Sequence, residues 1–269
     1  MIEGRWAVVA AGVLWSMGGV FIKWFDLPAL TIACYRSLFA GLVLVPWVLQ
    51  DREPFSGRAV WAALALYPLL LGSFVVATKA TTSANAIALQ YTAPLMVMVW
   101  AAMFLGERLT RGNVVGVALA SVGVGVIVYG GSGTPDMRGI VVALASGVVF
   151  SWLMIVQQLM RGVSPIKFVC VSNLVAAVAM APFVAGQWAV SGAQLAGLAV
   201  MGSVQIAAPY VLFTRGMRTV SAQDASLLTL VEPVLNPIWV YAIVGESPLP
   251  TTVIGGVLIL AGLAGRFLL

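Results

Sequence analysis

The stretch LLTLVEPVLNPIW, residues 227–239, decides how this sequence folds: it is apolar enough to lie in lipid, yet it carries an acid, an amide and two prolines. A shift of 139 residues places it on QYTAPLMVMVW, residues 90–100. The shift matches residues of identical type: Pro94 and Pro233, Trp100 and Trp239, and Gly106-Glu107 and Gly245-Glu246. The chain therefore holds an internal repeat, and each copy contains an apolar segment interrupted by proline.

Composition indicates a polytopic membrane protein. Hydrophobic residues make up 61% of the 269 residues and charged residues only 9%, whereas soluble domains are about 25% charged. The net charge of +5 comes from scattered basic residues, which do not form the continuous patch expected of a nucleic-acid-binding surface. Cys34 and Cys170 lie in apolar runs without metal-ligand neighbours, so we expect packing residues and no metal or cofactor.

Breaking the chain at its charged and Gly/Pro-rich positions leaves apolar runs near the ~20 residues that a transmembrane helix needs. The runs lack the alternation of membrane strands. There are ten of them: 5–25, 29–49, 59–78, 82–105, 112–130, 138–160, 166–186, 192–214, 221–244 and 251–268. The sequence therefore predicts an all-α membrane protein with ten transmembrane helices.

Basic residues favour one side when the loops between these segments are assigned alternately. Ten fall on one side: Arg5, Arg52, Arg58, Arg108, Arg111, Arg161, Lys167, Arg215, Arg218 and Arg266. Three fall on the other: Lys23, Lys79 and Arg138. Because cytoplasmic loops are enriched in Lys and Arg, both termini are predicted to lie in the cytoplasm, as in a multi-pass protein of the cytoplasmic (inner) membrane.

The repeat spans the whole chain, since a shift of 137 residues also places Trp15 on Trp152 and Pro28 on Pro165. Five helices per copy is an odd number, so the second copy must enter the membrane inverted. We expect a first repeat over 1–130, a connection over 131–138 and an inverted repeat over 139–269. Inverted repeats are typical of secondary transporters with a substrate site between the halves.

Several short motifs resemble the EamA-type branch of the drug/metabolite transporter superfamily. They are VLWSMGG at 13–19, LGERLT at 105–110, FSW at 150–152, Glu232-Pro233 and VGES at 244–247. The resemblance covers essentially the whole chain, although GESPLP departs from the usual GERLT in the second copy. It implies a central cavity lined by the first, third, fourth, sixth, eighth and ninth helices, and export or exchange of small metabolites such as amino acids.

Polar residues of the ninth segment share one face of a helix: Thr229, Glu232 and Asn236 fall within a narrow arc. An ionised carboxylate exposed to lipid at this depth costs about 3 kcal/mol, so Glu232 must be protonated, paired or hydrated. It is either a substrate contact, a proton-coupling group or a structural contact to a neighbouring helix. Asp224, near the cytoplasmic end of the same segment, is the second candidate for proton coupling.

Two further features have competing interpretations. Pro94, Pro233 and Pro237 remove amide donors, so they predict kinks that act as gates or are fixed by packing. Arg36 lies about seven residues into the second segment and is matched in the repeat by Asn173. It could reach the outer interface, pair with an acid or bind a substrate carboxylate, and a structural role is favoured.

Other candidate lining residues share helix faces with small or polar neighbours, and each aromatic one has ordinary packing as its alternative. They are Trp15 and Ser16; Tyr67, Phe74 and Thr78; Ser83 and Gln90; Ser151, Trp152 and Gln158; and Gln205. In the fifth and tenth segments, Gly112, Gly116 and Ala120, and Ala261 and Gly265, have the four-residue spacing of close helix packing. These segments therefore support the bundle or form a homodimer face.

Together these patterns predict a secondary transporter for small neutral or zwitterionic metabolites that works by alternating access. A passive facilitator or channel is the first alternative. An intramembrane enzyme is disfavoured because the chain has no histidine and a single acid deep in a segment. No GxxxxGK[ST] phosphate loop is present for an ATP-driven pump. The expected partners are a small-molecule metabolite and the lipid bilayer, without nucleic acid.

Overall fold

The computed structural model describes residues 2–105, 110–131, 136–160, 162–216, 219–220 and 228–265, and every regular element within these ranges is helical. The first half contains α1 (Ile2–Ser16), α2 (Gly18–Trp24), α3 (Ala29–Val48), α4 (Arg58–Ala80), α5 (Ser83–Gln90), α6 (Ala93–Leu105) and α7 (Arg111–Gly131). The second half contains α8 (Met137–Gln158), α9 (Pro165–Met180), η1 (Ala181–Val184), α10 (Gly192–Val200), η2 (Met201–Ala207), α11 (Ala208–Gly216), α13 (Val231–Val244) and α14 (Pro250–Gly265).

Seven helical stretches of the described residues are long and apolar enough to cross a membrane, and Val231–Val244 and Pro250–Gly265 are shorter apolar helices. The fourth apolar segment of the sequence appears as two short helices, α5 and α6. Local sequence explains several ends: the Thr82 side chain caps α5 by accepting from the Asn85 backbone N–H at 3.1 Å. Ser191 and Gln194 form a capping box at α10.

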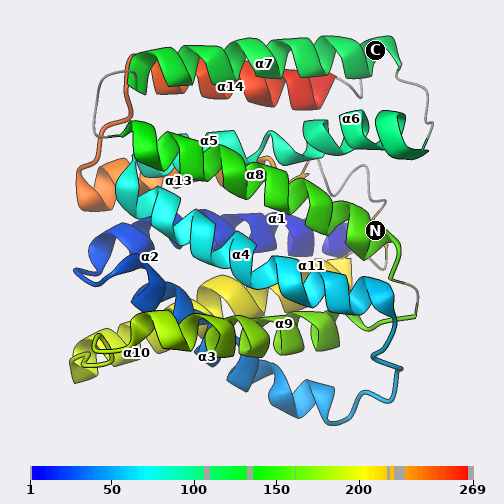
Figure 1. Cartoon of the computed structure of the whole chain (residues 1–269), viewed down its shortest axis with the longest axis vertical. Coiled ribbons are helices and arrows are strands. Elements are labelled where there is room, and N and C mark those ends of the chain that lie inside the picture. Colours follow the sequence, from blue (N-terminus) through cyan, green and yellow to red (C-terminus); the bar gives the residue numbers. More distant parts are fainter. Residues whose placement is uncertain are drawn as a thin grey trace.

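The helices lie roughly side by side, with α7 and α14 at one end of the assembly and α3, α9 and α10 at the other (Figure 1). One buried cluster is built mainly from α3, α4 and α9, and a second from α5, α7, α8 and α14. Large apolar side chains such as Trp61, Leu69 and Val257 are exposed on the outside. Exposed apolar surface of this extent suits a chain surrounded by lipid.

The repeat has a structural counterpart in α7 and α14, which occupy equivalent positions in the two copies. A Cβ atom added to Gly116 would lie 2.7 Å from the Gly262 carbonyl oxygen, and one added to Gly123 would lie 2.5 Å from that of Gly255. Gly116 and Gly255 are repeat equivalents, as are Gly123 and Gly262, so each contact is the exchanged image of the other. The two helices are therefore antiparallel and meet in a reciprocal, two-fold manner.

Gly116 of the expected small-residue stripe is thus used within the chain, whereas on α14 the contact uses Gly255 and Gly262; of the two residues expected there, Ala261 is exposed and a Cβ atom on Gly265 meets nothing within 4 Å. Backbones approach this closely only where neither side carries a Cβ. The homodimer through these helices stays a prediction, and it would have to use their other faces, where Val114, Val122, Val253 and Val257 are exposed.

Candidate functional site

Three transmembrane segments are interrupted where they pack against one another. The first breaks at Met17 between α1 and α2, and the fourth breaks at Tyr91-Thr92 between α5 and α6. In the ninth segment, Thr229 and Leu230 form a turn before α13, which packs on α1, α2 and α5. Since the shift of 139 residues places Tyr91 on Leu230, two of the interruptions are equivalent by the repeat. Discontinuous helices of this kind form the substrate sites of many transporters.

The break in the first segment is held by amide side chains from distant helices. Gln205 Nε2 donates to the Trp15 carbonyl oxygen at 3.2 Å, and Asn236 Nδ2 donates to that of Ser16 at 3.0 Å. Ser83 Oγ donates to Asn236 Oδ1 at 2.8 Å. These bonds satisfy carbonyls that an unbroken helix would have satisfied itself. Ser16, Ser83 and Asn236 are all buried.

The contact between Ser83 and Asn236 leaves no room for a side chain at the neighbouring Gly19. A Cβ atom on Gly19 would lie 2.1 Å from Ser83 Oγ and 2.7 Å from Asn236 Nδ2. Trp239 Nε1 also donates to Ser16 Oγ at 3.1 Å. Asn236 therefore has both ends of its amide occupied, and its described role is to join three segments.

Glu232 lies in the first turn of α13, directly after the interruption. Tyr91 Oη donates to Glu232 Oε2 at 2.8 Å and also lies 3.3 Å from the Thr229 carbonyl oxygen. Among the described residues, no Lys or Arg lies within salt-bridge distance of this half-buried carboxylate. A carboxylate whose one contact is a neutral hydroxyl can exchange a proton or accept a cationic group.

An aromatic group lies beside the same break. The Trp15 ring meets Tyr210 edge-on at a centroid distance of 5.1 Å and packs on Phe213 at 5.4 Å. Tyr210 and Phe213 both belong to α11, which packs on α1.

The sixth segment brings its polar residues to α5 and α6. Gln90 Nε2 donates to Ser146 Oγ at 3.0 Å, and Trp100 Nε1 donates to Ser151 Oγ at 2.9 Å. Trp152 stacks on Trp100 at a centroid distance of 5.7 Å and is 36% exposed. Gln90, Ser151 and Trp152 thus form helix–helix contacts here. Gln158 ends α8, and its side chain lies outside the described residues.

The expected stripe on α4 is divided among three roles. Tyr67 is buried, and its hydroxyl accepts from Asn173 Nδ2 at 3.0 Å. Thr78 Oγ1 donates to the Phe74 carbonyl oxygen of its own helix at 2.8 Å, and the Phe74 side chain packs against both buried clusters. Of the three residues, Tyr67 has the contacts that connect it with other polar groups of the interior.

The three prolines lie in two different settings, and Arg36 lies in the interior. Pro94 and Pro233 lie in the first turns of α6 and α13, where a missing amide donor breaks no helical bond, so they restart helices; Pro237 lies inside α13. Arg36 is 2% exposed and has no ion-pair partner among the described residues. It therefore neither reaches the interface nor pairs with a described acid. Asp224 lies outside the described residues.

An ion-pair network that the sequence did not predict joins helices at one end of the bundle. Lys23 Nζ lies 2.6 Å from Glu246 Oε2 and donates to the Thr81 carbonyl oxygen at 2.7 Å. The Ser83 backbone N–H donates to Glu246 Oε1 at 2.7 Å. The network joins α2, the α4–α5 connection and the segment after α13, and so links the two repeats. Its one signal in the sequence was the acid of VGES.

Comparison with known proteins agrees with this architecture. The profile of the EamA-like transporter family matches twice, over residues 3–129 and 137–267. An uncharacterised transporter of Archaeoglobus fulgidus is 28% identical over 274 residues, which cover 97% of this chain and 95% of the relative. A probable terminal-alkyne amino-acid exporter of Streptantibioticus cattleyicolor is 26% identical over 273 residues, covering 96% and 91%.

The crystal structure of another protein has the same fold, with a TM-score of 0.70 and a sequence identity of 19%. The match covers 98% of this chain and 97% of the other. The relatives named as transporters point to a transporter rather than an enzyme. Because the family profile matches both halves of the sequence, this multi-pass membrane protein belongs to the EamA-like transporter family.

Proposed function

We propose that this protein is a secondary transporter that moves small neutral or zwitterionic metabolites, such as amino acids, by alternating access across the cytoplasmic membrane. The observation that carries the proposal is the set of interrupted segments around Glu232. Broken helices and an acid without a counter-ion are costly within a bilayer, and they are retained where they contact a substrate or coupling ion.

The site chemistry favours this substrate class over polyanions. Its described polar groups are hydroxyls and amides with one acid, Glu232, and one arginine, Arg36. Phosphorylated metabolites would need several basic groups. A relative is named as a probable amino-acid exporter, which supports amino acids as substrates and export or exchange as the direction.

We further propose ten transmembrane helices with both termini in the cytoplasm, divided into repeats over 1–130 and 139–269. The reciprocal antiparallel contact of α7 and α14 supports an inverted relation between the copies. Alternating access then follows, because two packings related by exchange of the copies have similar energies.

The test is a thermal-shift screen of amino acids and small amines on purified protein, followed by counterflow in proteoliposomes. A carrier loaded with unlabelled ligand accumulates labelled ligand transiently above its equilibrium level. Equilibration without that overshoot would indicate a passive channel, and the absence of any ligand-dependent flux would refute the proposal.

A further inference from the structure

Buried polar atoms without a hydrogen-bond partner are concentrated in one part of the described chain. They are Arg36 Nε, Ser37 Oγ, Ser172 Oγ, Asn173 Oδ1 and Gln205 Oε1. All belong to α3, α9 or η2. Since native interiors satisfy most buried polar groups, a concentration of free ones needs an explanation.

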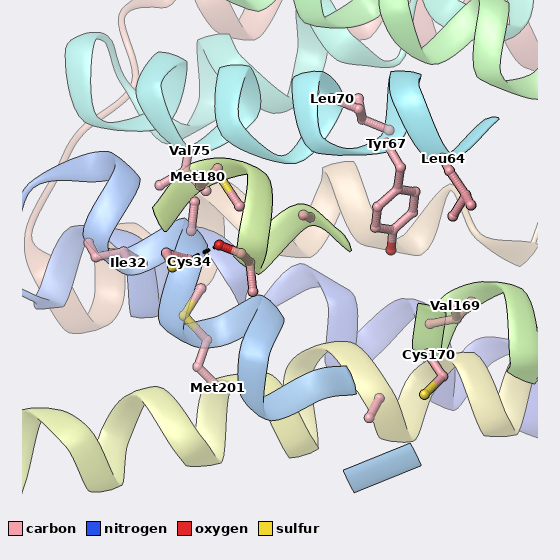
Figure 2. Close-up of a cluster of buried hydrophobic side chains, with 14 of the residues drawn as sticks. Ile32, Cys34, Leu64, Tyr67, Leu70, Val75, Val169, Cys170, Met180 and Met201 are labelled. Carbon is pink, nitrogen blue, oxygen red and sulfur yellow. Dashed lines mark hydrogen bonds between the residues drawn. The ribbon is translucent and has the colours of Figure 1, made fainter. Parts of the chain in front are cut away.

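Contacts between helices bring these residues to one level of the bundle. Cys34 Sγ donates to the Ala177 carbonyl oxygen and Cys170 Sγ donates to that of Gly41, both at 3.3 Å; Figure 2 shows the first of these bonds. The two contacts make α3 and α9 antiparallel and place the pair Arg36–Ser37 within about one helical turn of the level of Ser172–Asn173. Arg36 and Asn173 are repeat equivalents, so this level is where the two copies meet.

The Asn173 amide is held in one orientation. Its Nδ2 donates to Tyr67 Oη at 3.0 Å and to the Val169 carbonyl oxygen at 2.8 Å, which leaves Oδ1 free. Tyr67 projects from α4 with its hydroxyl directed away from that helix (Figure 2). Among the described residues, no counter-ion lies within salt-bridge distance of the Arg36 guanidinium.

Arg36 is the eighth residue of α3, about 10 Å along the helix axis from its start. A buried arginine with a structural role is expected to have an acid or carbonyl partner. Arg36 is 2% exposed, its Nε is unpartnered, and no described carboxylate lies within 4.0 Å. The charge is thus available to an anion that the described residues do not supply.

We propose, resting on the transport function above, that Arg36 binds the carboxylate of the substrate. One guanidinium matches one carboxylate in charge and in its bidentate geometry, whereas a phosphate group would need more positive charge. Asn173 Oδ1 is a free acceptor for the N–H groups of an ammonium. Glu232, the acid beside the interruption of the ninth segment, supplies the opposite charge. The substrate class is therefore narrowed to zwitterions that carry both a carboxylate and a protonated amine.

The test uses three probes of one shape: L-leucine, L-leucinamide, which lacks the carboxylate, and 4-methylpentanoate, which lacks the amine. Wild type is expected to bind leucine at least tenfold more tightly than leucinamide, as measured by ligand-dependent thermal shift and by counterflow. Arg36→Gln should lose that preference: its affinity for leucine should fall at least tenfold, whereas its affinity for leucinamide should stay unchanged. Arg111→Gln, at the exposed start of α7, is the control and should behave as wild type.

A second variant reports on the role of Arg36 without any ligand. Arg36→Met removes an unpaired buried charge, so the unfolding temperature should stay equal or rise. A large fall would assign Arg36 a structural role and overturn the proposal. The proposal for Arg36 would also be overturned if Arg36→Gln kept the preference for leucine, or if wild type transported leucine and leucinamide equally well. Neither outcome would contradict the transport function. No flux of any screened metabolite would instead refute the transport function.

Discussion

The contact between α7 and α14 can be tested with a pair of glycine substitutions on one helix. A Cβ atom on Gly123 would lie 2.5 Å from the Gly255 carbonyl oxygen and 2.9 Å from Ile259 Cγ1, whereas one on Gly125 meets nothing within 4 Å. A carbon–oxygen contact normally needs about 3.3–3.6 Å. Gly123→Ala must therefore push the backbones apart by roughly 1 Å, enough to forfeit a quarter to a half of each affected contact.

Overpacking of this kind costs about 1–3 kcal/mol. Both substitutions gain the same helix propensity of Ala over Gly, about 1 kcal/mol, so their difference isolates the packing cost. We expect Gly123→Ala to have a free energy of unfolding about 1–3 kcal/mol below that of Gly125→Ala, measured by SDS titration in mixed micelles. Gly116→Ala, against Gly262, should behave like Gly123→Ala. Equal stabilities of the two variants, within about 0.5 kcal/mol, would refute the close contact.

Two further predictions concern the ends of the bundle. Lys23→Met removes the 2.6 Å ion pair with Glu246, so a cysteine placed at Thr82 should react severalfold faster with an impermeant maleimide; an unchanged rate would show that the pair does not close this end. In the α3–α4 loop, a hydrogen bond with Ser164 is the main cause that holds the pKa of Asp51 below its ordinary value. The ionised Asp51 therefore stabilises the folded loop above the ordinary pKa of an aspartate, about 4. This stabilisation is lost as the pH falls through the lowered pKa of the folded state. The protection factors of the loop amides, which compare observed with intrinsic exchange rates, should fall there in wild type and be low at every pH in Asp51→Asn; protection equal to wild type in that variant would contradict the prediction.

Helix positions were predictable because the length of each apolar run, and the polar and Gly/Pro-rich residues that separate the runs, are local properties of the sequence. The segment expected at 29–49 is α3 over Ala29–Val48, and that expected at 138–160 is α8 over Met137–Gln158. The interruption at Met17 was not predictable. It depends on amides of Gln205 and Asn236 that lie about 190 and 220 residues away in sequence.

The candidate site was predictable only in part, because its hydrogen bonds also join residues that are distant in the sequence. Helical periodicity places Glu232 and Asn236 on one face, but it cannot tell a free group from one that is bonded. The structure gives Asn236 two protein partners and leaves Glu232 with Tyr91. Tyr91 was missed, although it lies three residues before the repeated proline Pro94, because its partner comes from the other copy.

The measurement that tests the central claim most directly is pH-driven transport by Glu232→Gln in proteoliposomes, with Glu53→Gln in the α3–α4 loop as the control. The substitution preserves the shape of the side chain and removes its charge and its exchangeable proton. We predict that the variant inserts and unfolds like wild type, yet loses accumulation driven by a pH gradient at least tenfold. Accumulation with the wild-type rate and pH dependence would contradict the assignment of Glu232 to the transport site.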